Sequence, residues 1–278
     1  MVTRPATSAP VAATAGLLLT ALAAAACSTW GGFSKPYPAQ VRARPEIALG
    51  ETSVLLHMAQ PSGGAVPSVL LFHVTGDSGW YGLDPVFFDT MAGRGHTIAG
   101  VSARAVRARL GALGAEATPA RLADEYVRLI DTATERLSLA PGTPVVITGL
   151  SRGAGLAVVA ATQPQLSQRV AGVLIMGLTA DEDTVRPAAA PFALLDRVGC
   201  PLVLLQSTHD RHVPAGQARR LFGPDVQDRK LVAIEAKGHT FGGNHQELFA
   251  QVEAGLDWIA RKVGAHRLSE ARVRRIPA

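Results

Sequence analysis

The stretch Pro144-Val-Val-Ile-Thr-Gly-Leu-Ser-Arg-Gly-Ala-Gly155 predicts a buried strand, a sharp turn and a helix in direct succession. Gly149 and Gly153 flank the serine in a Gly-x-Ser-x-Gly pattern, and their lack of side chains lets the chain turn tightly. Such a turn leaves the hydroxyl of Ser151 exposed at the carboxyl end of a sheet. The backbone N–H of Arg152 would then point to the place where an oxyanion forms. We therefore take Ser151 as a candidate nucleophile.

Outward from this stretch, apolar runs alternate with helical patterns along the chain. The runs are Val69–His73, Thr97–Val101, Val170–Met176, Pro201–Gln206 and Leu231–Ile234. The helical patterns are Asp84–Arg94, with Asp84 as N-cap, Thr118–Leu137, Ala154–Gln163 and Gln246–Lys262. Continuous apolar strands joined by helices are typical of a mostly parallel central sheet with helices on both faces. We predict one α/β domain over residues 46–263, which opens with two short antiparallel strands at Ile47–Leu49 and Ser53–Met58.

The length and charge of the chain suit a single domain with a basic end. It has 278 residues, 47% hydrophobic and 18% charged, with a formal net charge of +5. Four arginines and one glutamate follow residue 264, so we predict a basic tail over 264–278. That tail is either solvated and frayed or in contact with anionic lipid. We expect no nucleic-acid partner, because no nucleic-acid motif or basic-aromatic interleaving accompanies the charge.

Residues 1–26 have the pattern of a lipoprotein signal peptide. The run Val11–Ala26 is apolar but too short to be a good membrane span, and small residues precede Cys27 as in a bacterial lipobox. On this interpretation Cys27 is acylated and residues 27–45 form a flexible tether. The protein would be periplasmic and lipid-anchored, and Ser28 favours the outer membrane because it is not the aspartate of inner-membrane lipoproteins. The alternative is plain secretion after an Ala-x-Ala site.

Two residues downstream of Ser151 supply what a serine nucleophile needs. A hydroxyl is a poor nucleophile at neutral pH and requires a base that a third group orients. Asp210 follows the apolar run that ends at Gln206, and His239 follows a glycine after the run that ends at Ile234. The order serine, acid, histidine is the order found in α/β-hydrolases. We predict a catalytic triad of Ser151, His239 and Asp210.

Other residues compete for the roles of base and acid. His209, His212 and His245 are rival bases, but none of them directly follows a predicted strand and a glycine. Asp181 and Asp183 are rival acids, because some α/β-hydrolases take the acid from the end of the preceding strand. The sequence favours His239 and Asp210 and leaves the rival acids open.

A second oxyanion donor is expected from the loop Thr75-Gly-Asp-Ser-Gly79, which follows an apolar run. We assign it to the backbone N–H of Asp77, beside Gly76, where the absence of a side chain allows close approach of a substrate. The Asp77 carboxylate would oppose an oxyanion, so we expect it to brace the loop or to meet a cationic substrate group. Trp80 is expected to pack against the helix from Asp84, with substrate stacking as the alternative. Gly76, Asp77, Trp80 and Arg152 are the candidate substrate contacts.

No metal or cofactor is predicted. The chain contains no His-Glu-x-x-His pattern or clustered cysteine pairs of the kind that bind zinc. It also contains no phosphate-cradling Gly-x-x-x-x-Gly-Lys motif and no dinucleotide fingerprint.

The loop Thr75-Gly-Asp-Ser-Gly-Trp80 resembles the Gly-Asp-x-Gly-Trp signature of the bacterial VirJ/AcvB virulence-protein family, a branch of the α/β-hydrolases. The resemblance continues through Gly100-Val-Ser102, Gly149-Leu-Ser-Arg-Gly-Ala154 and Lys237-Gly-His-Thr-Phe241. It covers roughly Val69 to Ala260, which is nearly all of the predicted domain.

This resemblance implies an α/β-hydrolase fold and hydrolysis of aminoacylated phosphatidylglycerol at the periplasmic side of a membrane. Ser151 would attack the aminoacyl ester, His239 would take its proton, and Asp210 would orient His239. Arg152 would attract the lipid phosphate, and Asp77 would meet the aminoacyl ammonium. Other esters, thioesters or peptides are alternative substrates. A different alternative is a non-catalytic binding factor on a hydrolase scaffold, which would associate with secretion-system proteins.

Overall fold

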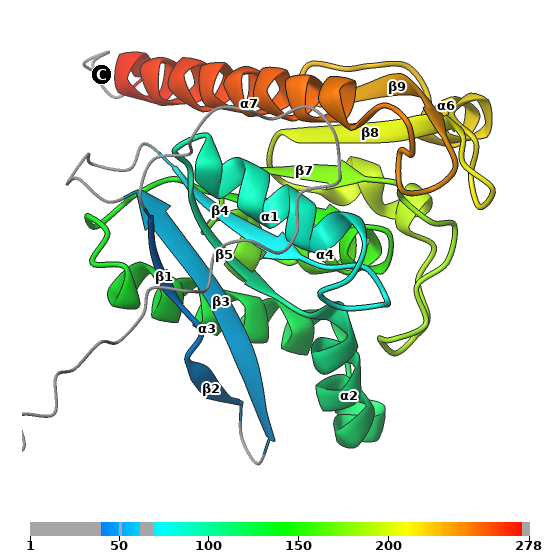
Figure 1. Cartoon of the computed structure of the whole chain (residues 1–278). Coiled ribbons are helices and arrows are strands. Elements are labelled where there is room, and N and C mark those ends of the chain that lie inside the picture. The colour runs from blue at the N-terminus through cyan, green and yellow to red at the C-terminus, as the bar shows by residue number, and fades with distance from the viewer. Residues whose placement is uncertain (1–39, 50–51, 62–68, 274–278) are drawn as a thin grey trace, which may run out of the picture. The chain divides into compact units, whose positions relative to one another are not determined.

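The computed structural model describes residues 40–49, 52–61 and 69–273 (Figure 1). The predicted signal peptide, Cys27 and most of the predicted tether therefore lie outside the described residues. In the part that is described, the strands form one sheet whose neighbours run β1-β3-β5-β4-β6-β7-β8-β9, with β2 also paired to β3. The strands are β1 Gln40–Ala43, β2 Glu46–Leu49, β3 Thr52–Pro61, β4 Leu70–Val74, β5 Thr97–Val101, β6 Val145–Leu150, β7 Gly172–Met176, β8 Leu202–His209 and β9 Arg229–Lys237.

The sheet is mostly parallel, as the sequence predicts. Strands β5, β4, β6, β7, β8 and β9 pair in parallel, and the antiparallel pairs involve β3, with β1, β2 and β5. The helices are α1 Leu83–Gly93, α2 Ala103–Leu113, α3 Pro119–Arg136, α4 Arg152–Ala161, α5 Pro164–Ser167, α6 Ala215–Phe222 and α7 His245–Val273. None of the helices among the described residues is long and apolar enough to cross a bilayer.

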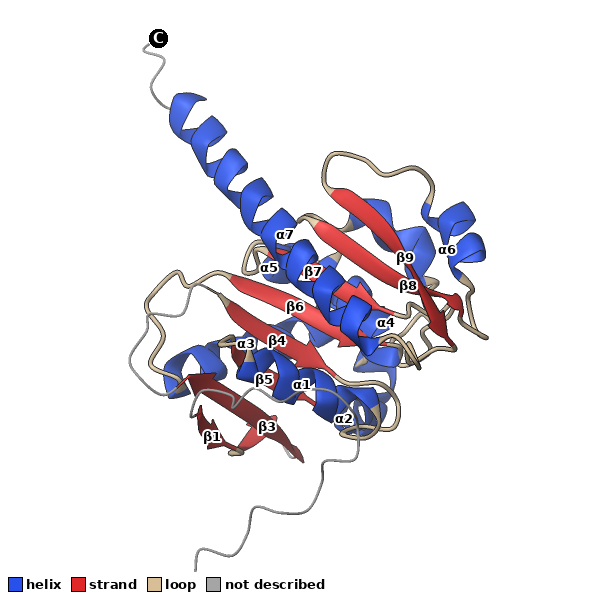
Figure 2. Ribbon diagram, turned by 45° about the horizontal axis from the view of Figure 1, so that its top comes forward, coloured by secondary structure: helices blue, strands red, loops and turns tan. Residues whose placement is uncertain are grey.

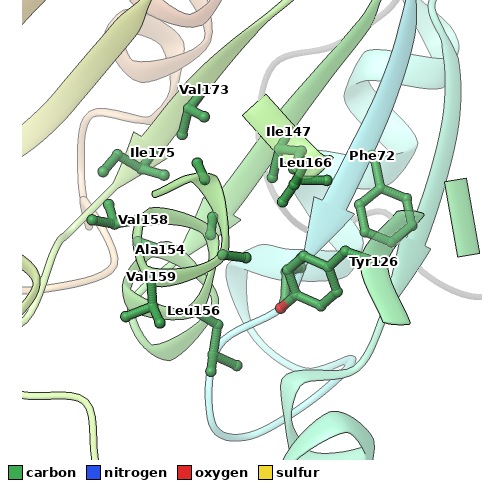
Figure 3. Packing of buried hydrophobic residues seen from close by; sticks show 14 of the residues in the cluster. Phe72, Tyr126, Ile147, Ala154, Leu156, Val158, Val159, Leu166, Val173 and Ile175 are labelled. Carbon is green, nitrogen blue, oxygen red and sulfur yellow. The ribbon is translucent and has the colours of Figure 1, made fainter. Parts of the chain in front are cut away.

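Both faces of the sheet are buried because apolar side chains point to either side of each central strand. In β4, Phe72 belongs to the hydrophobic cluster on one face and Leu71 to the cluster on the other. Helices α3 and α4 cover the first face, where the ring of Tyr126 meets Phe72 edge-on with centroids 5.7 Å apart (Figure 3). Helices α1 and α7 cover the second face (Figure 2). The continuous apolar runs in the sequence follow from this two-sided burial.

The structure corrects the predicted boundaries at both ends of the domain. Residues Gln40–Ala43, predicted as tether, form strand β1 and pair with β3. The closing helix α7 continues to Val273, so much of the predicted basic tail over 264–278 is helical rather than a separate tail. Helices α2 and α6 were not expected, because α2 is an arginine-rich segment and α6 has only three buried residues.

Candidate active site

Ser151 lies at the junction between β6 and α4 in a backbone conformation that is rare for a residue with a side chain. Its φ is 55° and its ψ is −116°, and among the described non-glycine residues only Ser138 and Phe241 share a positive φ. The Ser151 N–H donates to the carbonyl of Met176 on β7, 3.0 Å away, which fixes the turn against the neighbouring strand. Strain held in this way is characteristic of functional turns.

The turn at Ser151 can close only because Gly149 and Gly153 carry no side chain. A Cβ built on Gly153 would lie 2.1 Å from the Val74 carbonyl oxygen. A Cβ built on Gly149 would lie 2.6 Å from the backbone carbon of Gly153. The two glycines of the sequence motif therefore serve the close packing of α4 against β4 and β6.

Replacing Gly153 with alanine is expected to destabilise the fold by about 3 kcal/mol, because backbone must move to admit the methyl group. Gly111, exposed on α2 with open space at its Cβ position, provides the matched control. Gly111→Ala should stabilise by about 0.8 kcal/mol through helix propensity. Urea unfolding of both variants measures the difference, and equal midpoints would contradict this account of the turn.

The structure brings His239 and Asp210 together from the loops that follow β9 and β8. His239 Nδ1 lies 2.7 Å from Asp210 Oδ2. The other ring nitrogen, Nε2, is buried and has no hydrogen-bond partner among the described residues. His239 and Ser151 line the same pocket of about 900 Å³. The imidazole therefore has one nitrogen held by a carboxylate and the other free for a proton.

Asp210 is buried and its four acceptor positions are filled. Its Oδ1 accepts from the backbone N–H groups of His212 (2.8 Å) and Val213 (3.4 Å), and its Oδ2 accepts from Gln206 Nε2 (2.9 Å) as well as His239. Burial would raise the pKa of Asp210, but the hydrogen bonds from His239 and the His212 backbone outweigh it and lower the pKa. The carboxylate thus stays ionised and oriented.

The rival acids and bases lie elsewhere. Asp183 pairs with Arg152 at 2.5 Å, and Asp181 lines the pocket wall without a contact to His239. None of the rival bases contacts Asp210 through its ring. His209 pairs with Glu235, His245 contacts the carbonyl of Thr240, and His212 lies edge-on to His239 with ring centroids 4.7 Å apart. Of these groups, Asp210 is the carboxylate that His239 contacts.

The Asp77 carboxylate braces its loop rather than facing the pocket unpaired. Arg152 binds it through two nitrogens, Nε to Oδ1 at 3.1 Å and Nη2 to Oδ2 at 3.2 Å, and Arg107 on α2 adds a contact of 2.9 Å. Two arginines therefore compensate the negative charge that would oppose an oxyanion. The backbone N–H groups of Asp77 and Arg152 donate to no other described residue, so both are free to act as donors.

Arg152 is the centre of a charge cluster that joins three loops. Besides Asp77, its guanidinium contacts the buried Glu182 at 3.1 Å and Asp183 at 2.5 Å. Burial disfavours the charged form, but the hydrogen bonds that the guanidinium donates to Asp77 and Asp183 and the charge of Glu182 outweigh it and raise the pKa of Arg152. Because three carboxylates occupy the guanidinium, the predicted contact of Arg152 with a lipid phosphate is not supported. The same pairing occupies Asp77, so its predicted contact with an ammonium group is not supported either.

Replacing Arg152 with lysine should lower kcat about 10-fold with KM little changed, because a single ammonium cannot hold the two-point pairing with Asp77. The thermal midpoint should remain near that of the unaltered protein. Arg104→Lys, on the exposed side of α2 and without an ion pair in the described part of the chain, is the matched control. Steady-state kinetics on a p-nitrophenyl ester measure the effect, and identical kcat values for both variants would contradict it.

Trp80 is partly buried and packs against helix α1, as the sequence favours. Its indole stacks on His57 of β3 at 4.1 Å and meets Phe88 of α1 edge-on at 5.3 Å. A Cβ at Gly100 would lie 2.8 Å from the indole, so this glycine of β5 makes room for it. Trp80 is not among the residues that line the pocket, and its candidacy as a substrate contact is therefore wrong.

Several residues around the pocket were missed by sequence reasoning. Gln206, a polar residue inside an apolar run, orients Asp210 and accepts from the Leu178 N–H at 3.0 Å. Gly177, with a positive φ, lies so close to His239 that a Cβ would be 3.1 Å from the ring. Asp84 does not act as the N-cap of α1, because the helix begins at Leu83 and its carboxylate binds elsewhere. Of these residues, only Gln206 could have been found from the sequence: it is an amide inside an apolar run, and a buried amide needs hydrogen-bond partners.

Comparison with known proteins places the fold. No family model and no curated protein matches the sequence. A candidate dienelactone hydrolase from Klebsiella pneumoniae superposes with a TM-score of 0.60 at 14% identity, over 80% of this chain and 99% of that one. Est1E from Butyrivibrio proteoclasticus gives 0.56 at 12% identity, over 80% and 99%. An acylaminoacyl peptidase from Pyrococcus horikoshii gives 0.56 at 18% identity, over 81% of this chain and 41% of the peptidase. The chain therefore has the α/β-hydrolase fold.

Proposed function

We propose that the protein is a serine hydrolase that cleaves carboxylic esters through Ser151, His239 and Asp210. The observation that carries the proposal is the part-buried His239, whose Nδ1 is held by Asp210 at 2.7 Å while its buried Nε2 has no partner among the described residues and Ser151 lines the same pocket. The names of the solved structures with this fold, among them hydrolases and peptidases, are consistent with it.

The proposed reaction has two steps. Ser151 Oγ attacks the ester carbonyl carbon while its proton passes to His239 Nε2, and the carbonyl oxygen becomes an oxyanion. The backbone N–H groups of Arg152 and Asp77 stabilise this oxyanion. His239 then protonates the departing alcohol oxygen, which leaves an acyl-enzyme. In the second step water gives a proton to His239 Nε2 and attacks the acyl carbon. The bond from that carbon to Ser151 Oγ then breaks, His239 returns the proton to Ser151 Oγ, and the acid is released. Asp210 orients the ring and stabilises the imidazolium throughout.

For the substrate, we propose an aminoacylated phosphatidylglycerol, on the VirJ/AcvB resemblance, with two charged residues of the pocket as the contacts. Asp181 and Arg211 line the pocket and are exposed, and neither forms an ion pair with another described residue. An ester with an ammonium on its acyl side and a phosphate on its alcohol side would offer both of them partners. This assignment replaces Asp77 and Arg152, whose charges are already paired.

Incubation with lysyl- and alanyl-phosphatidylglycerol vesicles, followed by lipid chromatography, tests this substrate. We expect release of the free amino acid, and a several-fold loss of that rate in Arg211→Ala without loss of activity on neutral p-nitrophenyl acetate. Arg104→Ala, at an exposed arginine that does not line the pocket, is the control. Activity on the neutral ester with none on either lipid would overturn the lipid substrate and leave the hydrolase assignment intact.

We also propose that acylation of Cys27 anchors the protein to the periplasmic side of the envelope, with the outer membrane favoured. The support is the sequence pattern alone. Labelling cells with a palmitate analogue tests it: the full chain should take up label, and Cys27→Ser should not. Equal labelling of both forms would contradict the anchor.

A further inference from the structure

A buried group of three polar side chains lies directly beneath the proposed oxyanion loop. Asp84, 3% exposed at the start of α1, accepts from the Gly76 N–H with both oxygens at 3.2 Å. Its Oδ1 also lies 3.0 Å from His73 Nε2, and His73 Nδ1 lies 3.0 Å from the hydroxyl of Thr148 on β6. His73, Asp84 and Thr148 come from three different elements, and the histidine and threonine are fully buried.

The protonation of this group follows from its contacts. An ionised carboxylate can only accept hydrogen bonds, so in this arrangement His73 has its N–H at Nε2 and donates a hydrogen bond to Asp84. The hydroxyl of Thr148 can then donate to Nδ1. The chain of hydrogen bonds runs from the strand that feeds Ser151, through His73 of the neighbouring strand, to the carboxylate at the loop. Burying a carboxylate is costly unless it is fully satisfied, and here it is satisfied by the loop it touches.

The bond from Gly76 to Asp84 decides which amide of the loop can serve an oxyanion. Gly76 is next to the nucleophile, because a Cβ built on it would lie 3.6 Å from Ser151 Cβ and 3.5 Å from Asp84 Oδ2. Its N–H would be a natural donor to the substrate, but Asp84 occupies it. The next N–H along the chain, that of Asp77, has no acceptor among the described residues. Arg107 and Arg152 hold the carboxylate of that same residue.

We propose that Asp84, oriented by His73 and Thr148, is a positioning residue. It fixes the Thr75–Gly76 peptide, and through it the adjoining Gly76–Asp77 peptide, so that the Asp77 N–H faces the oxyanion. This inference rests on the proposed hydrolase function. Asp84 holds the loop from the protein interior, and Arg152 holds it from the rim of the pocket. Without Asp84 the Gly76 N–H is released and the Thr75–Gly76 peptide can rotate. The Gly76 carbonyl keeps its hydrogen bonds from the Thr75 hydroxyl and the Gly79 N–H, both at 3.0 Å, but the chain on its other side is no longer held, and the Asp77 N–H shifts from its place.

The first test uses the unaltered protein and phenylboronic acid, followed by amide NMR. The Ser151 oxygen adds to boron, its proton passes to His239, and no group leaves, so a boron hydroxyl occupies the oxyanion position. We expect large shifts for the Asp77 and Arg152 amides and slow hydrogen exchange at Gly76 with or without the boronate. Binding that shifts Gly76 in place of Asp77 would overturn the inference and leave the hydrolase intact. Absence of binding at Ser151 would instead count against the proposed function.

The second test separates positioning from stability by kinetics on a p-nitrophenyl ester. Asp84→Ala should lower kcat about 100-fold with KM within about 2-fold, since one oxyanion donor is misplaced. Asp84→Asn keeps an oxygen for the Gly76 N–H and should recover most of that loss. Affinity for the boronate should fall in parallel with kcat/KM across the variants. An Asp84→Ala protein that is folded and retains its kcat would overturn the inference.

If Asp84→Ala does not fold, a second pair of variants applies the same test from Thr148. Thr148→Val removes the hydroxyl that holds His73 but keeps the shape of the side chain, and Thr148→Ser keeps the hydroxyl. We expect kcat to fall roughly 5-fold in the valine variant and to be restored in the serine variant, with KM constant in both. Equal kcat for the two would count against the chain of hydrogen bonds.

Discussion

Replacement of Ser151 by alanine is expected to lower kcat by about 10⁴-fold or more, because the variant lacks the atom that forms the acyl-enzyme. The residual rate would come from the oxyanion donors and substrate binding. The thermal midpoint should change little, since the strained φ of 55° is set by the packing around the turn and not by the hydroxyl. Kinetics on a p-nitrophenyl ester, with labelling by a fluorophosphonate probe, measure both the rate and the nucleophile.

The control is Ser207→Ala, a buried serine on β8 whose hydroxyl donates to the carbonyl of Ala236. That variant is expected to lose stability but to keep its fluorophosphonate labelling. The Ser151→Ala protein also separates catalysis from binding in cells. If it restores function fully in a strain that lacks the protein, a non-catalytic binding role is favoured and the hydrolase proposal fails.

Replacement of Asp210 by asparagine is expected to lower kcat by about 10³- to 10⁴-fold at neutral pH, because it reverses a hydrogen bond of His239. Asp210 accepts from Gln206 and His239 on one oxygen and from two backbone N–H groups on the other. An asparagine amide turned either way places its NH₂ group against donors. To relieve this conflict, His239 must change tautomer and place its N–H on Nε2. That nitrogen can then no longer take the proton of Ser151.

The control for this substitution is Asp225→Asn. Like Asp210, Asp225 accepts from a side chain, Arg219 at 2.6 Å, and from a backbone N–H, that of Leu231, but it lies outside the pocket lining. We expect its kcat within about 2-fold of the unaltered protein. Comparable losses in both variants would indicate a general effect of removing charge and would contradict the role of Asp210.

The pH dependence of stability gives an independent check on Asp210. Its pKa in the folded protein lies below its ordinary value of 3.8, so the ionised carboxylate stabilises the fold. That contribution is fully present above the pKa of the unfolded chain and is lost as the pH falls through the lower pKa of the folded protein. The stability difference between the unaltered protein and Asp210→Asn should therefore shrink on acidification below about pH 4.

Local sequence was sufficient for the turn at Ser151 and for the strands that carry the other candidate residues. The roles of Gly149 and Gly153 could be predicted because they depend on a local feature: neighbouring backbone approaches these positions too closely for any side chain. The central strands could be predicted because each is buried on both faces and is therefore a continuous apolar run in the sequence. Since candidate residues follow parallel strands, their gathering at one edge of the sheet was predictable from order alone.

The contacts of charged side chains were decided only by the tertiary structure. Whether Asp77 meets a substrate or an arginine depends on where α2 and the turn at Ser151 lie, and no local pattern fixes that. Asp84 satisfies a local rule for an N-cap, yet its carboxylate finds His73 and the Gly76 N–H, because β4 and the start of α1 bury it. Hydrogen bonding of a buried charge is settled by whichever donors the fold brings within 3 Å or so, and those donors come from distant parts of the chain.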